Sequence, residues 1–285
     1  MSSSKILKKI KYAMRIIPDR AYIQMYYFAH FKKFCNLKNP KTYNEKLNWL
    51  KLHDKNPIYT RIVDKFEAKE YVKDIIGDQY IIPTLGVWDN FDDIDFDELP
   101  QQFVLKCTHD SEGLVIVKDK DKLDKEMAKN KIESALKQNF FYIGREWPYK
   151  NVKPRIIAEK YMEDHIDGEL RDYKFFCFDG IPKVVYVGKD KAKDPRTDFF
   201  DMEFNHLPIR MRDPNAEIMP KKPIALEQMK SIAAKLSKGC PHLRVDFYLI
   251  NGNIYVGELT FFHCSGFTEV KPMEWNQIMG DWIHI

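Results

Sequence analysis

Four residues near the C-terminus could together bind a metal ion and a phosphate group. They lie in residues 243–260, where apolar and polar residues alternate on both sides of an Asn-Gly pair, a strong signal for a β-hairpin. Arg244 and Asp246 share one face of the first strand, because successive side chains point to opposite sides. Glu258 and Thr260 share a face of the returning strand for the same reason.

If those two faces coincide, an arginine, two carboxylates and a hydroxyl converge between apolar strands. Placing two buried carboxylates side by side costs free energy unless a cation lies between them. Magnesium is held in proteins by one or two carboxylates together with the phosphates of a substrate. The hairpin therefore predicts a metal–nucleotide site. A solvated edge hairpin with an Arg–Asp pair is the alternative, and these residues alone do not decide between the two.

The chain is long enough for two packed lobes. It has 285 residues, of which 44% are hydrophobic and 14% aromatic, enough for substantial cores. No run approaches the roughly 20 apolar residues that cross a bilayer, and no signal peptide is evident. The cysteines lack Cys-x-x-Cys spacing, so we expect reduced, mostly buried thiols in a cytoplasmic protein. The five cysteines are Cys35, Cys107, Cys177, Cys240 and Cys264.

Positive charge is concentrated at the N-terminus. Residues 1–40 carry nine Lys or Arg and one acid, Asp19, which gives +8, so the remaining residues sum to −4 within a total of +4. This mildly acidic body argues against a nucleic-acid binder. Residues 1–17 show a partial apolar helical stripe flanked by lysines, before Pro18. Such a helix could lie on an anionic membrane surface or pack on the protein itself, and its short stripe favours the second.

The remaining chain alternates helix-like and strand-like segments. We expect helices over residues 42–52, 59–76, 122–140 and 226–237, the first opened by a capping box at Thr42 and Glu45. We expect strands over residues 85–88, 103–107, 114–117, 155–162, 173–178 and 183–187, besides the C-terminal hairpin, with residues 189–223 mostly loop. Strands joined by hairpins indicate an α+β fold with mixed or antiparallel sheets.

The loop Thr108–Gly113 connects two of these strands and follows Lys106. A hairpin of this kind can fold over phosphates with its backbone N–H groups and a hydroxyl. Neither a G-x-G-x-x-G nor a G-x-x-x-x-G-K-[ST] motif occurs, so Rossmann and P-loop nucleotide sites are excluded at the motif level. Taken alone, the loop fits an ordinary β-hairpin better than a phosphate site.

Taken in order, several segments resemble the TupA-like branch of the ATP-grasp superfamily, which is associated with teichuronopeptide and bacterial surface-polysaccharide synthesis. The segments that carry the resemblance are Asn39–Lys46, Val63–Lys65, Phe103–Cys107, Ile157–Tyr161, Asp172–Phe178, Arg244–Tyr248 and Gly257–Phe261. Each is weak alone, but together they span residues 39–261 in a consistent order.

The resemblance implies two α+β lobes that clasp ATP, and it implies a role for each matching residue. The phosphate-binding residues would be Lys65, Lys106, Thr108, His109, Ser111 and Gly113. The backbone of Glu159, Lys160, Tyr161 and Met162 would meet adenine, and Asp167 or Glu169 would meet the ribose. Lys174 and Arg244 would face the γ-phosphate as the catalytic residues, and Asp246 and Glu258, with Thr260 beside them, would hold Mg²⁺.

The same resemblance divides the chain into four regions. Residues 1–40 would be a basic N-terminal helical segment, and residues 41–100 the region that precedes the ATP-grasp core. Residues 101–162 would form the first lobe with the phosphate loop, and residues 163–285 the second lobe with the metal site.

Two departures from the family pattern affect the site. Many ATP-grasp enzymes end the metal strand with Glu-x-Asn, whereas Thr260 stands at the third position here. The phosphate loop is also poor in glycine, with Asp110 and Glu112 where small residues would ease the approach of a phosphate. Two carboxylates beside a triphosphate repel it unless they point outward or meet a metal.

The leading hypothesis is an ATP-dependent carboxylate–amine ligase. It would join an amino acid or other amine to a uronic-acid carboxylate of a surface polysaccharide or its precursor, a substrate implied by the resemblance alone. A sugar kinase on the same scaffold is the first alternative. A glycosyltransferase is the second, and it rests on a single Asp-x-Asp at Asp93–Asp95.

Several further side chains could serve an anionic substrate. Arg196, Arg210 and Arg212 lie in the expected loop, although a solvated face explains each one as well. Ser265 could line an acyl site beside His263, for which a structural role is the stronger interpretation. For His109 we leave open a phosphate contact or a solvent-facing position.

Overall fold

The computed structural model describes residues 12–165, 171–189 and 194–285. The helices are α2 (Asp19–Phe31), α3 (Tyr43–His53), α4 (Ile58–Val63), α5 (Glu67–Ile76), α6 (Lys125–Leu136), α7 (Phe141–Gly144), α8 (Leu226–Leu236) and α9 (Met273–Asp281). The strands are β1 (Thr84–Trp88), β2 (Phe103–Cys107), β3 (Leu114–Val117), β4 (Ile156–Lys160), β5 (Asp172–Phe178), β6 (Ile181–Lys189), β7 (Arg196–Phe200), β8 (His206–Leu207), β9 (His242–Ile250) and β10 (Asn253–Thr260). Short 3-10 turns occur at Met14–Ile16, Asp78–Tyr80, Phe91–Asp93, Lys120–Lys122, Trp147–Tyr149 and His263–Gly266.

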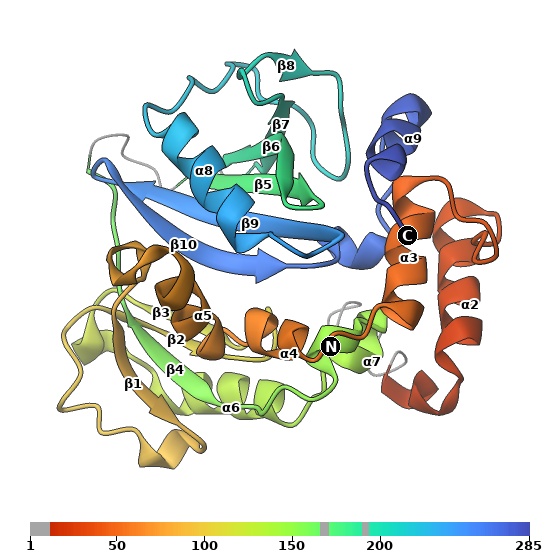
Figure 1. Cartoon of the computed structure of the whole chain (residues 1–285). Helices are drawn as coiled ribbons and strands as arrows, with labels where there is room; N and C mark the ends of the chain where they lie inside the picture. The colour runs from red at the N-terminus through yellow and green to blue at the C-terminus, as the bar shows by residue number, and fades with distance from the viewer. Residues whose placement is uncertain (1–11, 166–170, 190–193) are drawn as a thin grey trace.

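The described strands form two antiparallel sheets, as expected for an α+β fold. The larger sheet has the order β10-β9-β5-β6-β7-β8. The smaller has the order β1-β4-β2-β3. In Figure 1 the larger sheet lies above the smaller one, and α4 and α5 lie between them.

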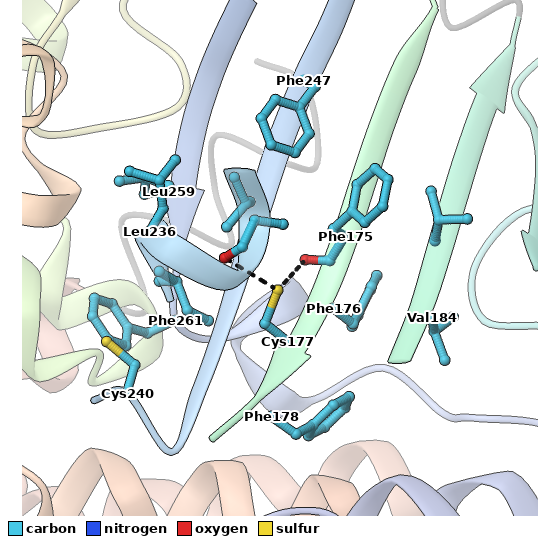
Figure 2. Packing of buried hydrophobic residues seen from close by; sticks show 14 of the residues in the cluster. Phe175, Phe176, Cys177, Phe178, Val184, Leu236, Cys240, Phe247, Leu259 and Phe261 are labelled. Atoms are coloured by element: carbon cyan, nitrogen blue, oxygen red, sulfur yellow. Dashed lines mark hydrogen bonds between the residues drawn. The ribbon is translucent and has the colours of Figure 1, made fainter. Parts of the chain in front are cut away.

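Each sheet has a helix on one face and therefore a core of its own. Helix α6 packs Ala128, Ile132 and Ala135 against the apolar residues of β2 and β4. Helix α8 covers the larger sheet on the face that carries Cys177, whose Sγ lies 3.9 Å from the carbonyl oxygen of Ala233. Figure 2 shows this core and the hydrogen bonds from the Cys177 thiol to the carbonyl oxygens of Phe175 and Ala233. Lys174, Arg244 and Asp246 alternate with the residues under α8, so they lie on the opposite face of the larger sheet.

The two lobes are joined near the strand that we expect to bind metal. Helix α4 packs on β10, and Ile81 forms an isolated parallel bridge to Val256 in the same strand. The predicted helix over residues 59–76 is interrupted, because the backbone of Asp64 is extended (ψ 117°) and its carboxylate accepts the N–H groups of Phe66 and Glu67. This interruption is a correction to the sequence prediction.

The described part of residues 189–223 is mostly loop, as predicted, but it contains a strand that was not predicted. Arg196–Phe200 pairs with β6 and extends the larger sheet as β7, followed by the short β8. Phe199 and Phe200 are the buried apolar side chains of this edge, and Thr197 is buried beside them. The alternation that marks a strand is hidden in the sequence by charged and proline-rich flanks.

At the N-terminus, the predicted basic helix over residues 1–17 lies mostly outside the described residues, which begin at residue 12. Helix α2 follows it and packs on α3 (Figure 1). None of the helices in the described ranges combines the length and the apolarity needed to cross a bilayer.

Candidate nucleotide and metal site

The C-terminal hairpin forms around the Asn-Gly turn as predicted. Asn251 and Gly252 both have positive φ, 49° and 81°, which is the conformation that a two-residue hairpin turn requires. The ladder then carries a β-bulge, because Val256 pairs with Phe247 and Glu258 with Asp246. Gly257 is the extra residue between those two pairs. The bulge moves Glu258 and Thr260 onto the face of Arg244 and Asp246, so the two polar faces coincide.

Arg244 is the centre of this polar cluster. Its guanidinium donates to both carboxylate oxygens of Asp246, at 2.6 and 2.8 Å. It also lies 3.4 Å from Glu258 and donates to the Thr260 hydroxyl at 3.1 Å. Lys174, on the neighbouring β5, contacts the same Asp246 carboxylate. Two strands and a bulge thus bring two cations to one buried carboxylate.

These cations fix the charge state of the cluster. Burial alone would raise the pKa of Asp246, but Arg244 and Lys174 outweigh burial and lower it to about 2. Burial lowers the pKa of His263 well below its usual value, and the nearby Arg244 and Lys174 add to this. Arg244 donates to His263 Nδ1 at 2.7 Å, and a guanidinium cannot accept. The neutral imidazole therefore carries its proton on Nε2.

A second charged cluster faces the hairpin from the smaller sheet. The carboxylate of Glu159 on β4 lies 2.5 Å from Lys106 on β2 and 2.6 Å from Lys69 on α5. Burial would raise the pKa of Glu159, yet the two lysines outweigh it and lower that pKa. Burial lowers the pKa of Lys69, which is also anchored to the carbonyl of Ile82 at 2.7 Å. Lys69 was not among the residues predicted from the sequence.

Lys65 is placed by the interruption between α4 and α5. Its backbone N–H donates to the carbonyl of Thr108 at 3.0 Å, and its ammonium contacts the carbonyl of Asp110. Asp64 is held by Arg155 at 2.8 Å, which fixes the turn from the other side. The break in the helix thus sets Lys65 against the predicted phosphate loop.

One pocket is lined by the second cluster and by Glu258 of the first. Its lining comes from both sheets and from the helices between them, with Lys65, Lys69, Lys106 and Glu159 on one side and Gly257 and Glu258 on the other. Within the described residues, no three His, Cys, Asp or Glu side chains gather as a preformed metal site. The pocket instead offers lysines beside a carboxylate, which suits a metal ion that arrives with a phosphate group.

The structure corrects the roles predicted for two side chains of the phosphate loop. The hydroxyl of Thr108 is buried and donates to the carbonyl of Lys153 at 3.3 Å. His109 is also buried, and its Nε2 lies 3.1 and 3.0 Å from the carbonyls of Ala135 and Gln138 at the end of α6. Neither side chain is available to a nucleotide, and His109 does not face solvent either.

The rest of the loop is compact. Ser111 is exposed at its tip. The Gly113 N–H donates to the Asp110 carboxylate at 3.1 Å, so this carboxylate is turned into the loop. A side chain at Gly113 would meet Cys107 Sγ at 2.3 Å, which explains the single glycine.

Residues of the predicted adenine segment occupy different positions. Glu159 lines the central pocket, whereas Lys160 and Tyr161 line an outer pocket with Leu85 and Lys118. The Lys160 N–H already donates to the carbonyl of Pro83 at 3.0 Å. Met162 lies just beyond β4 and is partly exposed. Asp167 and Glu169, predicted to meet the ribose, lie outside the described residues.

The predicted substrate arginines do not join the Arg244 cluster. Arg196 pairs with Lys189 across β6 and β7. This pair alternates with the pairs whose side chains lie on the face of Arg244, so Arg196 projects from the opposite face of the sheet. It is held there by Asp194 at 2.7 Å. Arg210 and Arg212 are exposed. This separation corrects the interpretation of Arg196 as a substrate ligand.

The chain was then compared with known proteins. The family model described as TupA-like ATPgrasp matches residues 45–284. The chain belongs to the TupA-like ATP-grasp family. The match confirms the predicted family and the α+β ATP-grasp fold class. No match was found among curated proteins.

Solved structures with a similar arrangement are distant in sequence. A D-alanine–D-alanine ligase from Bacillus anthracis complexed with ATP is 16% identical, with 78% of this chain and 58% of that chain covered and a TM-score of 0.45. A D-alanyl-alanine synthetase A from Vibrio cholerae is 12% identical, with 84% and 63% covered and a TM-score of 0.44. An N5-carboxyaminoimidazole synthase from Aspergillus clavatus is 13% identical, with 72% and 46% covered and a TM-score of 0.42. This chain spans less than two thirds of the length of each.

In this ATP-grasp chain, a left-handed turn follows β10. Cys264, Ser265 and Gly266 have φ values of 48°, 52° and 64°. Ser265 does not point at open space as a substrate ligand would, because its hydroxyl contacts the Glu146 carboxylate. Glu146 is buried, which raises its pKa, and Glu258 adds to that shift. Sequence reasoning missed Glu146.

Helix α3 holds this turn with side chains spaced four and three residues apart, on one helical face. Asn44 donates to the carbonyls of Gly266 and Thr268 at 3.1 and 2.9 Å, and Asn48 donates to that of Gly266 at 3.0 Å. Lys51 is buried and donates to the carbonyls of Ser265 and Gly144 at 2.6 and 2.8 Å. The Asn39–Lys46 segment thus begins the helix that braces the turn beside Arg244.

Proposed function

We propose that the chain is an ATP-dependent carboxylate–amine ligase that works through an acyl phosphate. The observation that carries this proposal is the shared pocket, in which Lys106 from one sheet and Glu258 from the other line the same space. Family membership supplies the nucleotide. The charge pattern supports a triphosphate, because Lys65, Lys69 and Lys106 line the same pocket.

The lysines differ in what they can do. Lys69 is fixed by Glu159 and by the Ile82 carbonyl, and its side chain is 14% exposed. Lys106 is 22% exposed and is paired with Glu159. An incoming phosphate oxygen competes with Glu159 for Lys106, while Lys69 keeps the buried carboxylate paired. Glu159 therefore orients two cations towards the pocket, and it stays paired with a lysine when the nucleotide binds.

The donor set of the opposite wall fits Mg²⁺. The side chain of Glu258 is 33% exposed, and Asp246 stays ionised beside it. Glu258 and Asp246 would hold the ion, which would neutralise charge on the phosphate oxygens. The Thr260 hydroxyl accepts from Arg244, so we assign it to positioning the arginine. Arg244 and Lys174 lie beside this pair and would stabilise charge that develops on the γ-phosphoryl group.

The proposed reaction has two steps, phosphoryl transfer and then amide formation. An oxygen of the substrate carboxylate bonds to the γ-phosphorus, and the bond from that phosphorus to the bridging oxygen of ADP breaks. The amine nitrogen then bonds to the acyl carbon, phosphate leaves, and the amine loses a proton. Excluding water protects the acyl phosphate. We place the second step beside the turn Cys264–Gly266, because that turn adjoins Arg244 through His263.

The substrate is the finer part of the proposal. Support comes from the family resemblance to proteins of surface-polysaccharide synthesis, so we propose a uronic-acid carboxylate and an amino acid or other amine. The test measures ADP and phosphate release over uronic acids crossed with amino acids, with product masses. We expect release only when both substrates are present, and loss of turnover in Lys106→Ala and Glu258→Ala.

Lys122→Ala is the matched control, because Lys122 is an exposed lysine that lines neither pocket and should keep full turnover. A stable phosphorylated sugar formed without amine would instead favour the kinase. Full activity of Glu258→Ala would overturn the metal assignment. The glycosyltransferase alternative has no support at Asp93–Asp95, where Asp93 is exposed and accepts from Asn90 at 2.9 Å.

A further inference from the structure

The outward side of helix α2 is apolar where a solvated helix would be polar. Ala21, Met25 and Phe28 follow one another at spacings of four and three residues, so they share one side of the helix. Met25 is 50% and Phe28 45% exposed. The inner side buries Tyr22, and its Ile23 and Tyr27 belong to a cluster with Phe267. Figure 1 shows α2 at the edge of the molecule, with α3 on its inner side.

The apolar surface continues beyond the C-terminal end of the helix. Phe34 is 68% exposed, and its ring centroid lies 5.1 Å from that of Phe28. Adjacent exposed aromatic rings on a solvated surface are unfavourable unless another phase or molecule covers them. We call Met25, Phe28 and Phe34 the α2 patch.

The charges around the α2 patch have one sign. Residues 12–40 contain five Lys or Arg and one acid, Asp19, for a net charge of +4. Asp19 is directed to the buried Arg145, 3.4 Å away, so it does not offset the exposed cations. The exposed cations are Arg15, Arg20, Lys32, Lys33 and Lys38.

We propose that the α2 patch is a docking surface for an anionic lipid bilayer. Phenylalanine and aliphatic side chains enter the boundary between headgroups and acyl chains, while neighbouring lysines and arginines meet the anionic headgroups. The one-sided charge favours a bilayer over a second copy of the chain, because two such patches would repel each other.

The test uses the full chain and vesicle sedimentation. Vesicles of phosphatidylcholine with about 30 mol% phosphatidylglycerol are compared with phosphatidylcholine alone. We expect binding to the anionic vesicles only, weakened by salt on the order of 0.5 M. Phe28→Ser combined with Phe34→Ser, and separately Lys32→Glu combined with Lys33→Glu, should each weaken binding at least about tenfold. Folding of each variant is checked by circular dichroism and thermal unfolding.

The matched control is Ile218→Ser combined with Ile224→Ser, which removes two other highly exposed aliphatic side chains, at 80% and 95%. It should leave vesicle binding unchanged. Unchanged binding of the Phe28/Phe34 variant would overturn the proposal, and so would equal loss in the control. A dimer in solution that the Phe28/Phe34 variant converts to monomer would also contradict it, since the patch would then cover a second copy.

Discussion

Asp246 and Glu258 face each other across β9 and β10 because Gly257 is an extra residue in the ladder. Counted outward from the Asn-Gly turn without a bulge, Asp246 would pair with Gly257, and Glu258 would point to the opposite face. The metal-binding pair that we propose is therefore created by a backbone irregularity. A side chain at Gly257 would meet the ring of Tyr248 at 2.6 Å, so the bulge also depends on glycine there.

Gly257→Ala should displace Glu258 from Asp246. We expect ATP turnover to fall on the order of 10- to 100-fold, because misplacing a phosphate-binding group by about 1 Å has an effect of that size. The measurement is magnesium-dependent ADP formation at saturating ATP. Asn253→Ala is the control, since Asn253 is exposed at the start of the same strand. Equal activity in Gly257→Ala would mean that the bulge does not matter.

Asp246 should make the protein sensitive to acid. Its folded-state pKa of about 2 lies below that of an unfolded aspartate, so its stabilisation is complete above about pH 4. It is lost as pH falls through about 2 and amounts to about 2 kcal/mol. Urea unfolding measured from pH 7 down to pH 2 should show that the free energy of unfolding falls less steeply with pH in Asp246→Asn than in the parent. In the control Asp97→Asn, which changes an exposed aspartate, the free energy of unfolding should fall with pH as it does in the parent. An identical pH dependence in all three proteins would contradict the pairing of Asp246 with its two cations.

Lys51 should contribute more stability than its neighbour on the same helix. Lys51→Met leaves the buried carbonyls of Ser265 and Gly144 without their donor, and we expect a loss of about 2 to 4 kcal/mol. Lys46→Met removes a single bond to Ile283 and should cost about 1 kcal/mol. Denaturant midpoints check the difference. If Lys46→Met proves the more damaging, α3 does not brace the turn in the way described.

Cys264 should be the thiol that reacts in the native protein. It is exposed, whereas Cys35, Cys107, Cys177 and Cys240 are buried. Burial raises the pKa of each buried thiol to about 12, which keeps it protonated and unreactive. Iodoacetamide followed by peptide mass analysis should find alkylation at Cys264 before any other site. Early modification of a buried cysteine would indicate that its lobe opens.

Much of the site was predictable because its residues lie on regular strands. Lys106, Lys174, Arg244 and Asp246 occupy the strands expected for them, and alternation alone places the last two on one face. The coincidence of that face with Glu258 was left open, since alternation predicts register only where no residue is inserted. Glycine at position 257 was the signal that could have indicated a bulge.

Other parts depend on contacts that the local sequence does not encode. Lys69 lies on an ordinary amphipathic helix, and it becomes a site residue only because the fold sets it against Glu159. His109 and Thr108 follow a strand in a polar loop, yet α6 and the Lys153 segment capture their side chains. Arg196 has the right charge but lies on the wrong face of a strand that the sequence hid.

The central claim is that Lys106 and Glu258 act on one magnesium-bound triphosphate. Calorimetric titration of ATP with magnesium into the parent chain, Lys106→Ala, Glu258→Ala and the double variant tests it directly. We expect each single change to weaken binding at least about tenfold, and the two effects to be non-additive, as they are for residues that share a ligand. Binding of the Glu258→Ala protein at the parent affinity, with the fold intact, would contradict the account.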